Sequence, residues 1–221
     1  STASFKLSDR YIRSCCLPWC ILRRLLEASA TKMFSFRLVL CIVLVACAFA
    51  KKENSEKDPN AYAENQRNFG LQDISFMTRL QKTFYVRRRD YNTTTRYRCL
   101  SATQVFKHEN GSYEYTLRAR YQGNYTSYNV TSIPKKTGSH LVNNSAYYEE
   151  FPGEGATHHK LMITDDNHSC FLFATEHTKG VYGCLLVVTA DIANETIPQT
   201  CLKVYKAQCQ KGVDLYRKNC K

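Results

Sequence analysis

The side chains with the greatest chemical potential in this sequence are its 11 cysteines and 6 histidines. The cysteines that follow position 50 are Cys99, Cys170, Cys184, Cys201, Cys209 and Cys220. None of these belongs to a C-x-x-C pair, and no histidine has metal-ligand spacing beside them, so the sequence predicts no metal site. The G-x-S-x-G motif that carries a serine nucleophile is also absent from this part of the chain. We therefore expect no cofactor and no enzymatic activity.

An even set of cysteines in a secreted chain indicates a disulfide framework. Cys201 and Cys209 have helical spacing, which would place them about 12 Å apart along the helix axis, too far to bond each other. Cys170 and Cys184 fall out of register in the hairpin described below. Six cysteines allow about 15 pairings, and these two exclusions still leave ten open.

The first 50 residues differ in character from the rest of the chain. Residues 33–50 have the pattern of a signal peptide: a short basic start at Met33–Arg37, an apolar core at Leu38–Phe49 and a small-x-small cleavage site. The apolar run is shorter than the roughly 20 residues that span a bilayer. We interpret 1–32 as translated sequence upstream of the true start, and 51–221 as one secreted domain without a membrane anchor.

The charge of the expected mature segment gives little reason to predict nucleic-acid binding. After position 50 the chain holds 24 basic and 17 acidic residues, a net charge of +7. Such a mild positive charge is compatible with anionic ligands. Arg87-Arg88-Arg89 is the densest basic run, and we interpret it as a solvated strand end.

The same segment is rich in N-x-S/T sequons. They begin at Asn92, Asn110, Asn124, Asn129, Asn143, Asn167 and Asn194. Composition alone predicts about two such sequons, so the excess indicates an extracellular glycoprotein.

Two apolar runs, Cys170–Thr175 and Val181–Val188, flank a short polar segment that contains Gly180. β-branched and aromatic runs of this length predict a β-hairpin. Alternation places on one face Phe171, Phe173, Leu185 and Val187. The opposite face carries Cys170 and Cys184, so it should be tied to an element outside. A strand pair that lines an interior and is covered from outside indicates a closed barrel with a packed helix.

Further strand patterns precede the hairpin at 83–89, 95–107, 113–122, 125–133, 140–148 and 158–164. With the hairpin they make eight strands, which fits an up-and-down antiparallel barrel. Alternation from Tyr113 to Tyr121 predicts that Tyr115 and Tyr121 point inside. Helical turns are expected within 59–80, and 199–210 has the pattern of a helix. The expected fold is therefore an all-β barrel with flanking helices, the C-terminal one packed outside.

These residues resemble the tick salivary lipocalins, the family of the tick histamine-binding proteins. The resemblance covers roughly residues 59–221. It rests on Tyr97-Arg-Cys99, Cys170-Phe-Leu-Phe, Tyr182-Gly-Cys184, Pro198-Gln-Thr-Cys201 and Cys220. It implies an eight-stranded calyx with the disulfides Cys99–Cys220 and Cys170–Cys201, and Cys184–Cys209 as the remaining pair. It also implies a secreted carrier, which we expect to be a monomer, that sequesters small host inflammatory mediators such as histamine.

The chain departs from the amine-binding members of this family where they carry acids. Those members have an Asp after the equivalent of Cys170 and Glu-Leu-Trp/Tyr after the Gly-Cys, where this chain has Phe171 and Leu185-Leu186-Val187. An ammonium ligand in a buried pocket needs carboxylates to compensate its charge. The pocket therefore predicts a fatty acid or eicosanoid, with Lys160 or Arg87 meeting its carboxylate.

Two alternatives stay open. Asp90, Tyr91 and Glu149 would supply an amine site of a different composition, and the loops could instead bind a protein of host complement or haemostasis. The full set of candidate ligand-binding residues is Arg87, Asp90, Tyr91, Tyr115, Tyr121, Glu149, Lys160, Phe171, Phe173, Leu185 and Val187.

Overall fold

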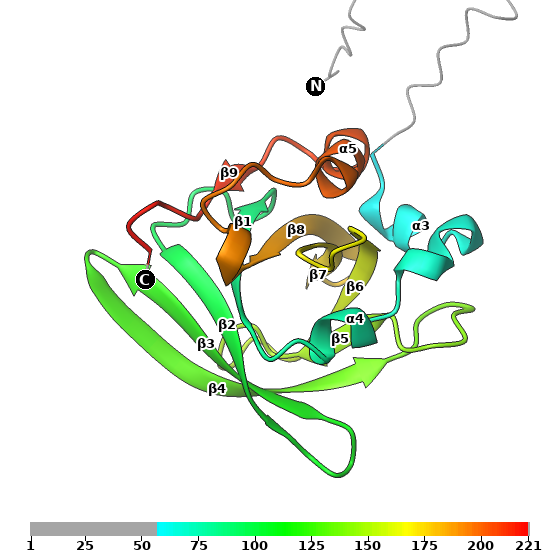
Figure 1. Cartoon of the computed structure of the whole chain (residues 1–221), viewed down its shortest axis with the longest axis horizontal. Coiled ribbons are helices and arrows are strands. Elements are labelled where there is room, and N and C mark those ends of the chain that lie inside the picture. Colours follow the sequence, from blue (N-terminus) through cyan, green and yellow to red (C-terminus); the bar gives the residue numbers. More distant parts are fainter. Residues whose placement is uncertain (1–56, 221) are drawn as a thin grey trace, which may run out of the picture. The chain divides into compact units, whose positions relative to one another are not determined.

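The computed structural model describes residues 57–220, so the interpretations of 1–32 and 33–50 lie outside the described residues. Figure 1 shows the elements, whose bounds are α3 Pro59–Ala63, η1 Gln66–Leu71, α4 Ser75–Thr78, β1 Thr83–Arg89, β2 Arg98–Lys107, β3 Tyr113–Tyr121, β4 Asn124–Lys135, β5 Ser145–Tyr148, β6 Thr157–Thr164, β7 Cys170–Thr178, β8 Val181–Thr189, η2 Ala190–Ile192, α5 Gln199–Gln208 and β9 Val213–Asp214. Between residues 57 and 220, no helix is long and apolar enough to cross a bilayer.

Strands β1 to β8 form a closed antiparallel barrel. Each strand pairs with the next in the sequence from β2 to β8, and β1 pairs with both β8 and β2. The contact between β1 and β2 is short, with Thr83 opposite Thr103 and Tyr85 opposite Ser101. The eight-stranded barrel and the C-terminal helix predicted from the sequence are confirmed. The two-residue β9, which pairs with the end of β1, was not predicted.

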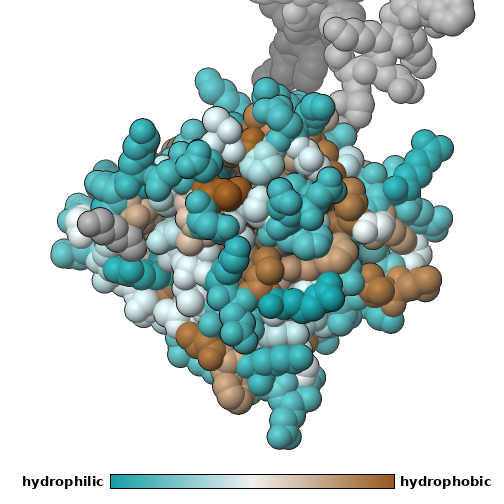
Figure 2. Space-filling model, viewed as in Figure 1, coloured by the Kyte–Doolittle hydropathy of each residue, from teal (hydrophilic) through white to brown (hydrophobic). Residues whose placement is uncertain are grey.

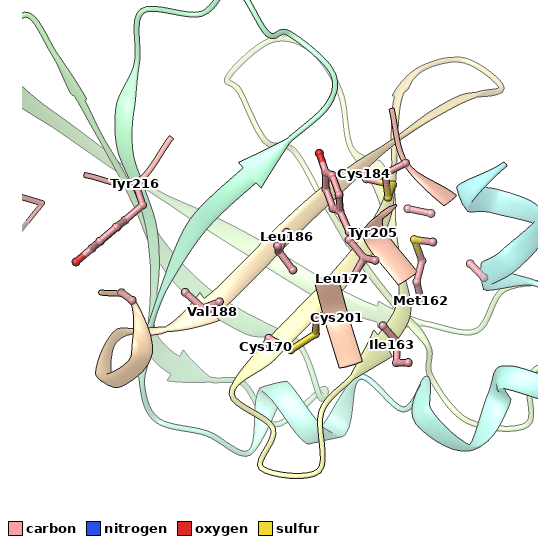
Figure 3. Close-up of a cluster of buried hydrophobic side chains, with 14 of the residues drawn as sticks. Met162, Ile163, Cys170, Leu172, Cys184, Leu186, Val188, Cys201, Tyr205 and Tyr216 are labelled. Carbon is pink, nitrogen blue, oxygen red and sulfur yellow. A yellow bond between two sulfur atoms is a disulfide. The ribbon is translucent and has the colours of Figure 1, made fainter. Parts of the chain in front are cut away.

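The hairpin β7–β8 separates two apolar cores, as its alternation predicts. Inside the barrel, Phe171, Phe173, Leu185 and Val187 pack with Ile74, Phe84, Tyr91 and Leu161. On the outer face, Leu172 and Leu186 pack against Cys201 and Tyr205 of α5 (Figure 3). Burying a large apolar side chain contributes about 1.5–3 kcal/mol, so both faces of this hairpin stabilise the fold.

Three disulfides attach the C-terminal segment to the barrel. Cys170–Cys201 and Cys184–Cys209 hold the two ends of α5 against β7 and β8. Cys99–Cys220 ties the end of the chain to β2. These are the three pairs that the family resemblance implies. They give α5 a fixed position on the outside of the barrel.

One predicted strand is shorter in the structure than in the sequence pattern. The pattern predicts 140–148, but β5 begins only at Ser145. The earlier residues form a loop because His140 is drawn into other hydrogen bonds: its ring nitrogens contact Thr137 O and Gln72 Oε1, both at 2.8 Å. His140 is buried, whereas its apolar neighbours Leu141 and Val142 are exposed. These two residues therefore do not form the buried face of a strand.

The two ends of the barrel are built differently. Because neighbouring strands are antiparallel, the β1–β2, β3–β4, β5–β6 and β7–β8 connections all lie at one end, which we call the open end. The start of β1 is at the opposite end, and α4 precedes it there. Ile74 N donates to Asn143 O in the β4–β5 loop at 2.9 Å, which holds the α4 segment across that closed end.

The pair Glu64–Lys160 links α3 to β6 and leads to a prediction about acid stability. Lys160 Nζ donates to Glu64 Oε1 at 2.6 Å and to Asn60 Oδ1 at 2.8 Å. Burial alone would raise the pKa of Glu64. The hydrogen bond from Lys160 and the positive charges nearby together lower it by more, so the pKa lies below its ordinary value of 4.5. A carboxyl with a lowered pKa stabilises the fold above its unfolded pKa, and this contribution disappears as the pH falls through the folded pKa.

We therefore expect Glu64→Gln to cost about 1–2 kcal/mol of unfolding free energy at pH 7. The difference from the natural protein should shrink as the pH is lowered below 4.5. Urea unfolding of both proteins at pH 7 and pH 3 measures it. A difference that is the same at both pH values would show that the lost carboxylate charge is not the cause.

Candidate ligand-binding cavity

A cavity occupies the barrel interior and reaches from the α4 segment at the closed end to Glu150 and Phe151 at the open end. Its volume is about 110 Å³. It is lined by Ile74, Met77, Thr78, Phe84, Val86, Leu100, Ser101, Ala102, Tyr115, Leu117, Arg118, Ala119, Tyr128, Val130, Ser132, Ala146, Tyr148, Glu150, Phe151, His159, Phe173, Leu185 and Val187. Most of these side chains are aliphatic or aromatic, so the cavity favours an apolar ligand.

The size of the cavity limits the ligand that it can enclose. A water molecule needs roughly 10–15 Å³ of such space, so about 110 Å³ accommodates on the order of ten water-sized groups. A ligand that is wholly enclosed should therefore have about ten non-hydrogen atoms. A longer molecule cannot be wholly enclosed in this volume.

A bulge in β1 turns one charged side chain, Arg89, into the barrel. The register of β1 against β8 shifts between Val86 and Arg88. As a result Val86 lines the cavity, Arg87 and Arg88 both face outward, and Arg89 points inward with 2% of its surface exposed. A β-bulge commonly redirects a side chain in this way.

Arg89 meets Glu150, which follows β5 at the open end. Arg89 Nη1 lies 3.4 Å from Glu150 Oε1, and Arg89 Nη2 donates to Asn92 O at 3.5 Å. The hydroxyl of Tyr91 donates to Glu150 Oε2 at 3.4 Å. Burial raises the pKa of Glu150, and the charge of Arg89 and the hydrogen bond from Tyr91 offset only part of this rise. Because arginine is always charged in proteins, the pair is neutral or positive, never negative.

Tyrosines surround this charged pair. The Tyr128 hydroxyl donates to Glu150 O, and burial together with the nearby carboxylates raises the pKa of Tyr128 to about 12. Burial raises the pKa of Tyr91 and of Tyr148 well above the usual tyrosine value. All three phenols are therefore protonated at neutral pH.

His159 adds a neutral polar group to the wall formed by β6. Its ring is stacked on Tyr148 with centroids 4.1 Å apart, and its Nδ1 lies 3.2 Å from Thr175 Oγ1. Burial lowers the pKa of His159 to about 3, so the imidazole carries no charge at physiological pH. It can exchange hydrogen bonds with a ligand but cannot balance an anion.

The structure brings together several of the candidate residues predicted from the sequence. Phe173, Leu185, Val187 and Tyr115 line the cavity. Phe171 belongs to the same interior core, where its ring meets Phe84 edge-on at 5.9 Å. The residues that stand where amine-binding members of the family carry acids are therefore inside the barrel.

Two cations expected to meet a ligand carboxylate are placed elsewhere. Lys160 points away from the cavity to Glu64 and Asn60, and its ammonium lies 5.0 Å from the centre of the Tyr182 ring. Arg87 lies on the outer surface of β1, with its guanidinium 5.5 Å from the centre of the Tyr216 ring. Neither side chain lines the cavity.

The remaining predicted polar candidates have structural contacts outside the cavity. Asp90 accepts from Cys184 N at 2.6 Å and from Gln210 N at 2.7 Å, which ties β8 to the segment after α5. Glu149 Oε1 accepts from Gly153 N at 2.7 Å and Gly155 N at 3.0 Å within the β5–β6 loop. Tyr121 packs on Tyr97 with centroids 5.1 Å apart. Tyr91 does not line the cavity either, but its hydroxyl contacts Glu150, which does.

Sequence reasoning missed Arg89, Glu150 and His159. For His159 the signal was available: alternation along β6 puts it on the same face as the buried Leu161 and opposite Lys160. No periodic pattern marks Arg89, because the bulge before it reverses the alternation. Glu150 follows β5 in an irregular loop, and only its contact with Arg89 distinguishes it from Glu149, which binds loop amides.

Glycosylation of the seven sequons stays a prediction. All seven asparagines are exposed: Asn92, Asn110, Asn124, Asn129, Asn143, Asn167 and Asn194. Their exposure is what glycan attachment requires.

Comparison with solved structures finds several of related architecture. Japanin from Rhipicephalus appendiculatus bound to cholesterol matches with 10% identity and a TM-score of 0.46, over 63% of this chain and 95% of that chain. The AM182 serotonin complex matches with 14% identity and a TM-score of 0.46, over 73% and 92%. Apocrustacyanin C2 matches with 12% identity and a TM-score of 0.44, over 72% and 84%.

At these sequence identities the matches do not indicate which ligand this chain binds. No curated protein sequence matches the chain significantly. The family assignment rests instead on a family model described as Tick histamine binding protein, which matches residues 62–221. This match includes all the strands of the barrel and all three disulfides. The chain belongs to the tick histamine-binding protein family.

Proposed function

We propose that this chain is a secreted carrier whose cavity encloses a compact, mostly apolar mediator, and that the polar group it takes is a carboxylate. The observation that supports this most directly is that Glu150, which lines a mostly apolar cavity, is paired with the buried Arg89. The pair is neutral or positive, so an incoming anion meets no net repulsion from it. An incoming cation has to compete with Arg89 for the same carboxylate.

The apolar lining would provide most of the binding free energy. Each buried CH₂ group contributes about 0.8 kcal/mol, and a chain of eight or so such groups matches the estimated capacity of the cavity. A medium-chain fatty acid therefore fits inside with its carboxylate at the open end. A longer fatty acid or an eicosanoid would leave part of its length in the opening.

An aromatic amine is the second candidate, and Glu150 is the observation that favours it. This carboxylate lies at the cavity, and Tyr91, Tyr128 and Tyr148 surround it with aromatic faces that attract cations. Against it, Glu150 is already paired with Arg89, and burial raises its pKa. Amine binding would therefore require Arg89 to give up its partner.

A calorimetric titration with decanoate, arachidonate, histamine and serotonin distinguishes the two candidates. We expect decanoate to bind the natural protein at least tenfold more tightly than either amine. Glu150→Gln should leave decanoate binding unchanged or improve it, because the variant removes the acid that competes for Arg89. Glu149→Gln is the matched control, since that carboxylate is engaged with the β5–β6 loop, and it should change neither affinity.

The opposite pattern would support the amine candidate. If histamine or serotonin binds more tightly than decanoate, and Glu150→Gln abolishes this binding while Glu149→Gln preserves it, the carboxylate proposal is wrong.

Binding of a host protein through the loops has weaker support. The most exposed large apolar residue among those described is Leu141, 86% exposed in the β4–β5 loop, followed by Phe106 at 56% and Val105 at 52% in β2. On the face shown in Figure 2, apolar residues form small areas separated by hydrophilic ones. Protein-binding sites are usually larger and contiguous, so we place function in the cavity.

The remaining expectations fit this proposal. Three disulfides are typical of proteins that mature in an oxidising compartment, and seven exposed sequons allow heavy glycosylation. We propose that residues 33–50 are the signal peptide, that residues 51–221 are the mature domain, and that this domain acts as a monomer to sequester its ligand.

A further inference from the structure

One nitrogen of His159 has no hydrogen-bond partner although it is buried. Only 1% of the residue is exposed, and Nε2 contacts neither a donor nor an acceptor of the described residues 57–220. Leaving a buried polar atom unpaired costs about 1–3 kcal/mol, so such an atom in a binding cavity indicates a ligand group. Nε2 lies at the edge of the ring away from the backbone, and the residue lines the cavity.

The neighbours of His159 decide whether Nε2 is a donor or an acceptor. Thr175 Oγ1 lies 3.2 Å from His159 Nδ1, so Nδ1 has a partner among the described residues and Nε2 is the ring nitrogen left for a ligand.

An imidazole that donates from Nδ1 to Thr175 Oγ1 has its lone pair on Nε2. The ring of Tyr148 stacks on one face of the imidazole, and the lone pair of Nε2 lies in the ring plane, so a hydrogen-bond donor has to approach Nε2 in that plane.

We propose that His159 Nε2 accepts a hydrogen bond from a hydroxyl or N–H group of the ligand. This inference rests on the proposed function, and it narrows the ligand class to compact apolar molecules that carry a hydrogen-bond donor in addition to any group near Arg89. A purely hydrocarbon tail against this wall leaves Nε2 unpaired, whereas a ligand with a donor at this position satisfies it.

The test uses three probes of about ten non-hydrogen atoms, the size estimated for the cavity: 2-naphthol, 2-methoxynaphthalene and naphthalene. Only 2-naphthol can donate. We expect the natural protein to bind 2-naphthol about three- to tenfold more tightly than the two others, measured by fluorescence titration. His159→Phe keeps a stacked ring but removes the acceptor, so it should erase this preference while naphthalene affinity changes less than twofold.

His158→Phe is the matched control. His158 is the preceding residue on the opposite face of β6, where its Nδ1 lies 3.0 Å from Ser145 Oγ, so this variant should retain the preference. Equal binding of the three probes, or a preference that persists in His159→Phe, would overturn the role of His159 and leave the proposed function intact. Failure of all three to bind would overturn the role of His159, while the titration with decanoate decides the proposed function separately.

A measurement on the natural protein covers the case in which His159→Phe does not fold. Two-bond proton–nitrogen NMR spectra of the ¹⁵N-labelled protein identify which ring nitrogen of each histidine carries the proton. We expect His159 to be protonated at Nδ1, and its Nε2 resonance to move when 2-naphthol is added. Protonation at Nε2, or an Nε2 resonance that ignores 2-naphthol, would contradict the proposal.

Discussion

Replacing both Cys99 and Cys220 with alanine should lower the free energy of unfolding by about 4–5 kcal/mol. The disulfide closes a loop of 121 residues, and in the chain-entropy model the loss of unfolded-state entropy grows with loop length. It also fixes the C-terminal segment, in which Leu215 accepts from Cys99 N and donates to Arg87 O, each at 3.0 Å. Denaturant unfolding under non-reducing conditions measures the loss.

The disulfide Cys184–Cys209 provides the control, because it closes a separation of only 25 residues. Removing it should cost about 1.4 kcal/mol less in the same model. Equal losses for the two double variants would show that local packing, rather than chain entropy, determines the contribution of each disulfide.

Replacing Arg89 with methionine should weaken decanoate binding at least about 30-fold, because losing one partner of a buried charged contact costs about 2–5 kcal/mol. Arg89 is buried and paired with Glu150, which lines the cavity, and its guanidinium lies 5.2 Å from the centre of the Tyr91 ring. Arg87→Met is the matched control from the same strand. Since Arg87 faces outward, this variant should bind decanoate within about twofold of the natural protein.

A double variant separates loss of binding from loss of stability. Arg89→Met alone leaves Glu150 buried without its cation, which is destabilising. Arg89→Met combined with Glu150→Gln removes both charges, so it should recover stability without recovering decanoate affinity. If the double variant binds decanoate as well as the natural protein does, the ligand carboxylate does not contact Arg89.

The regular part of the barrel could be predicted from the sequence because alternation fixes it. Along β7 and β8, inward and outward residues follow the two-residue period without interruption from Cys170 to Thr175, and Phe171 pairs with Val187 as the pattern requires. The same regularity identifies Phe173, Leu185 and Val187 as interior residues. The outer position of the cysteines also follows from it.

Arg89 and Glu150 could not be predicted in the same way, because the two-residue alternation of the strands is interrupted before each of them. The bulge in β1 brings Arg89 inside in place of Arg87. Glu149 and Glu150 follow the end of β5, and the hydrogen bonds of the loop decide that Glu149 binds loop amides while Glu150 meets Arg89. The family resemblance suggests Lys160 as a ligand contact. The alternation in β6 instead places it on the outer face, opposite His159 and Leu161, and the structure confirms this.

The most direct test of the cavity as the binding site is a crystal structure of the complex with decanoate. We expect the chain of the ligand to lie between Phe173, Leu185 and Val187, with its carboxylate within hydrogen-bond distance of Arg89. Decanoate bound outside the barrel, or with its carboxylate directed towards α4 at the closed end, would contradict this account.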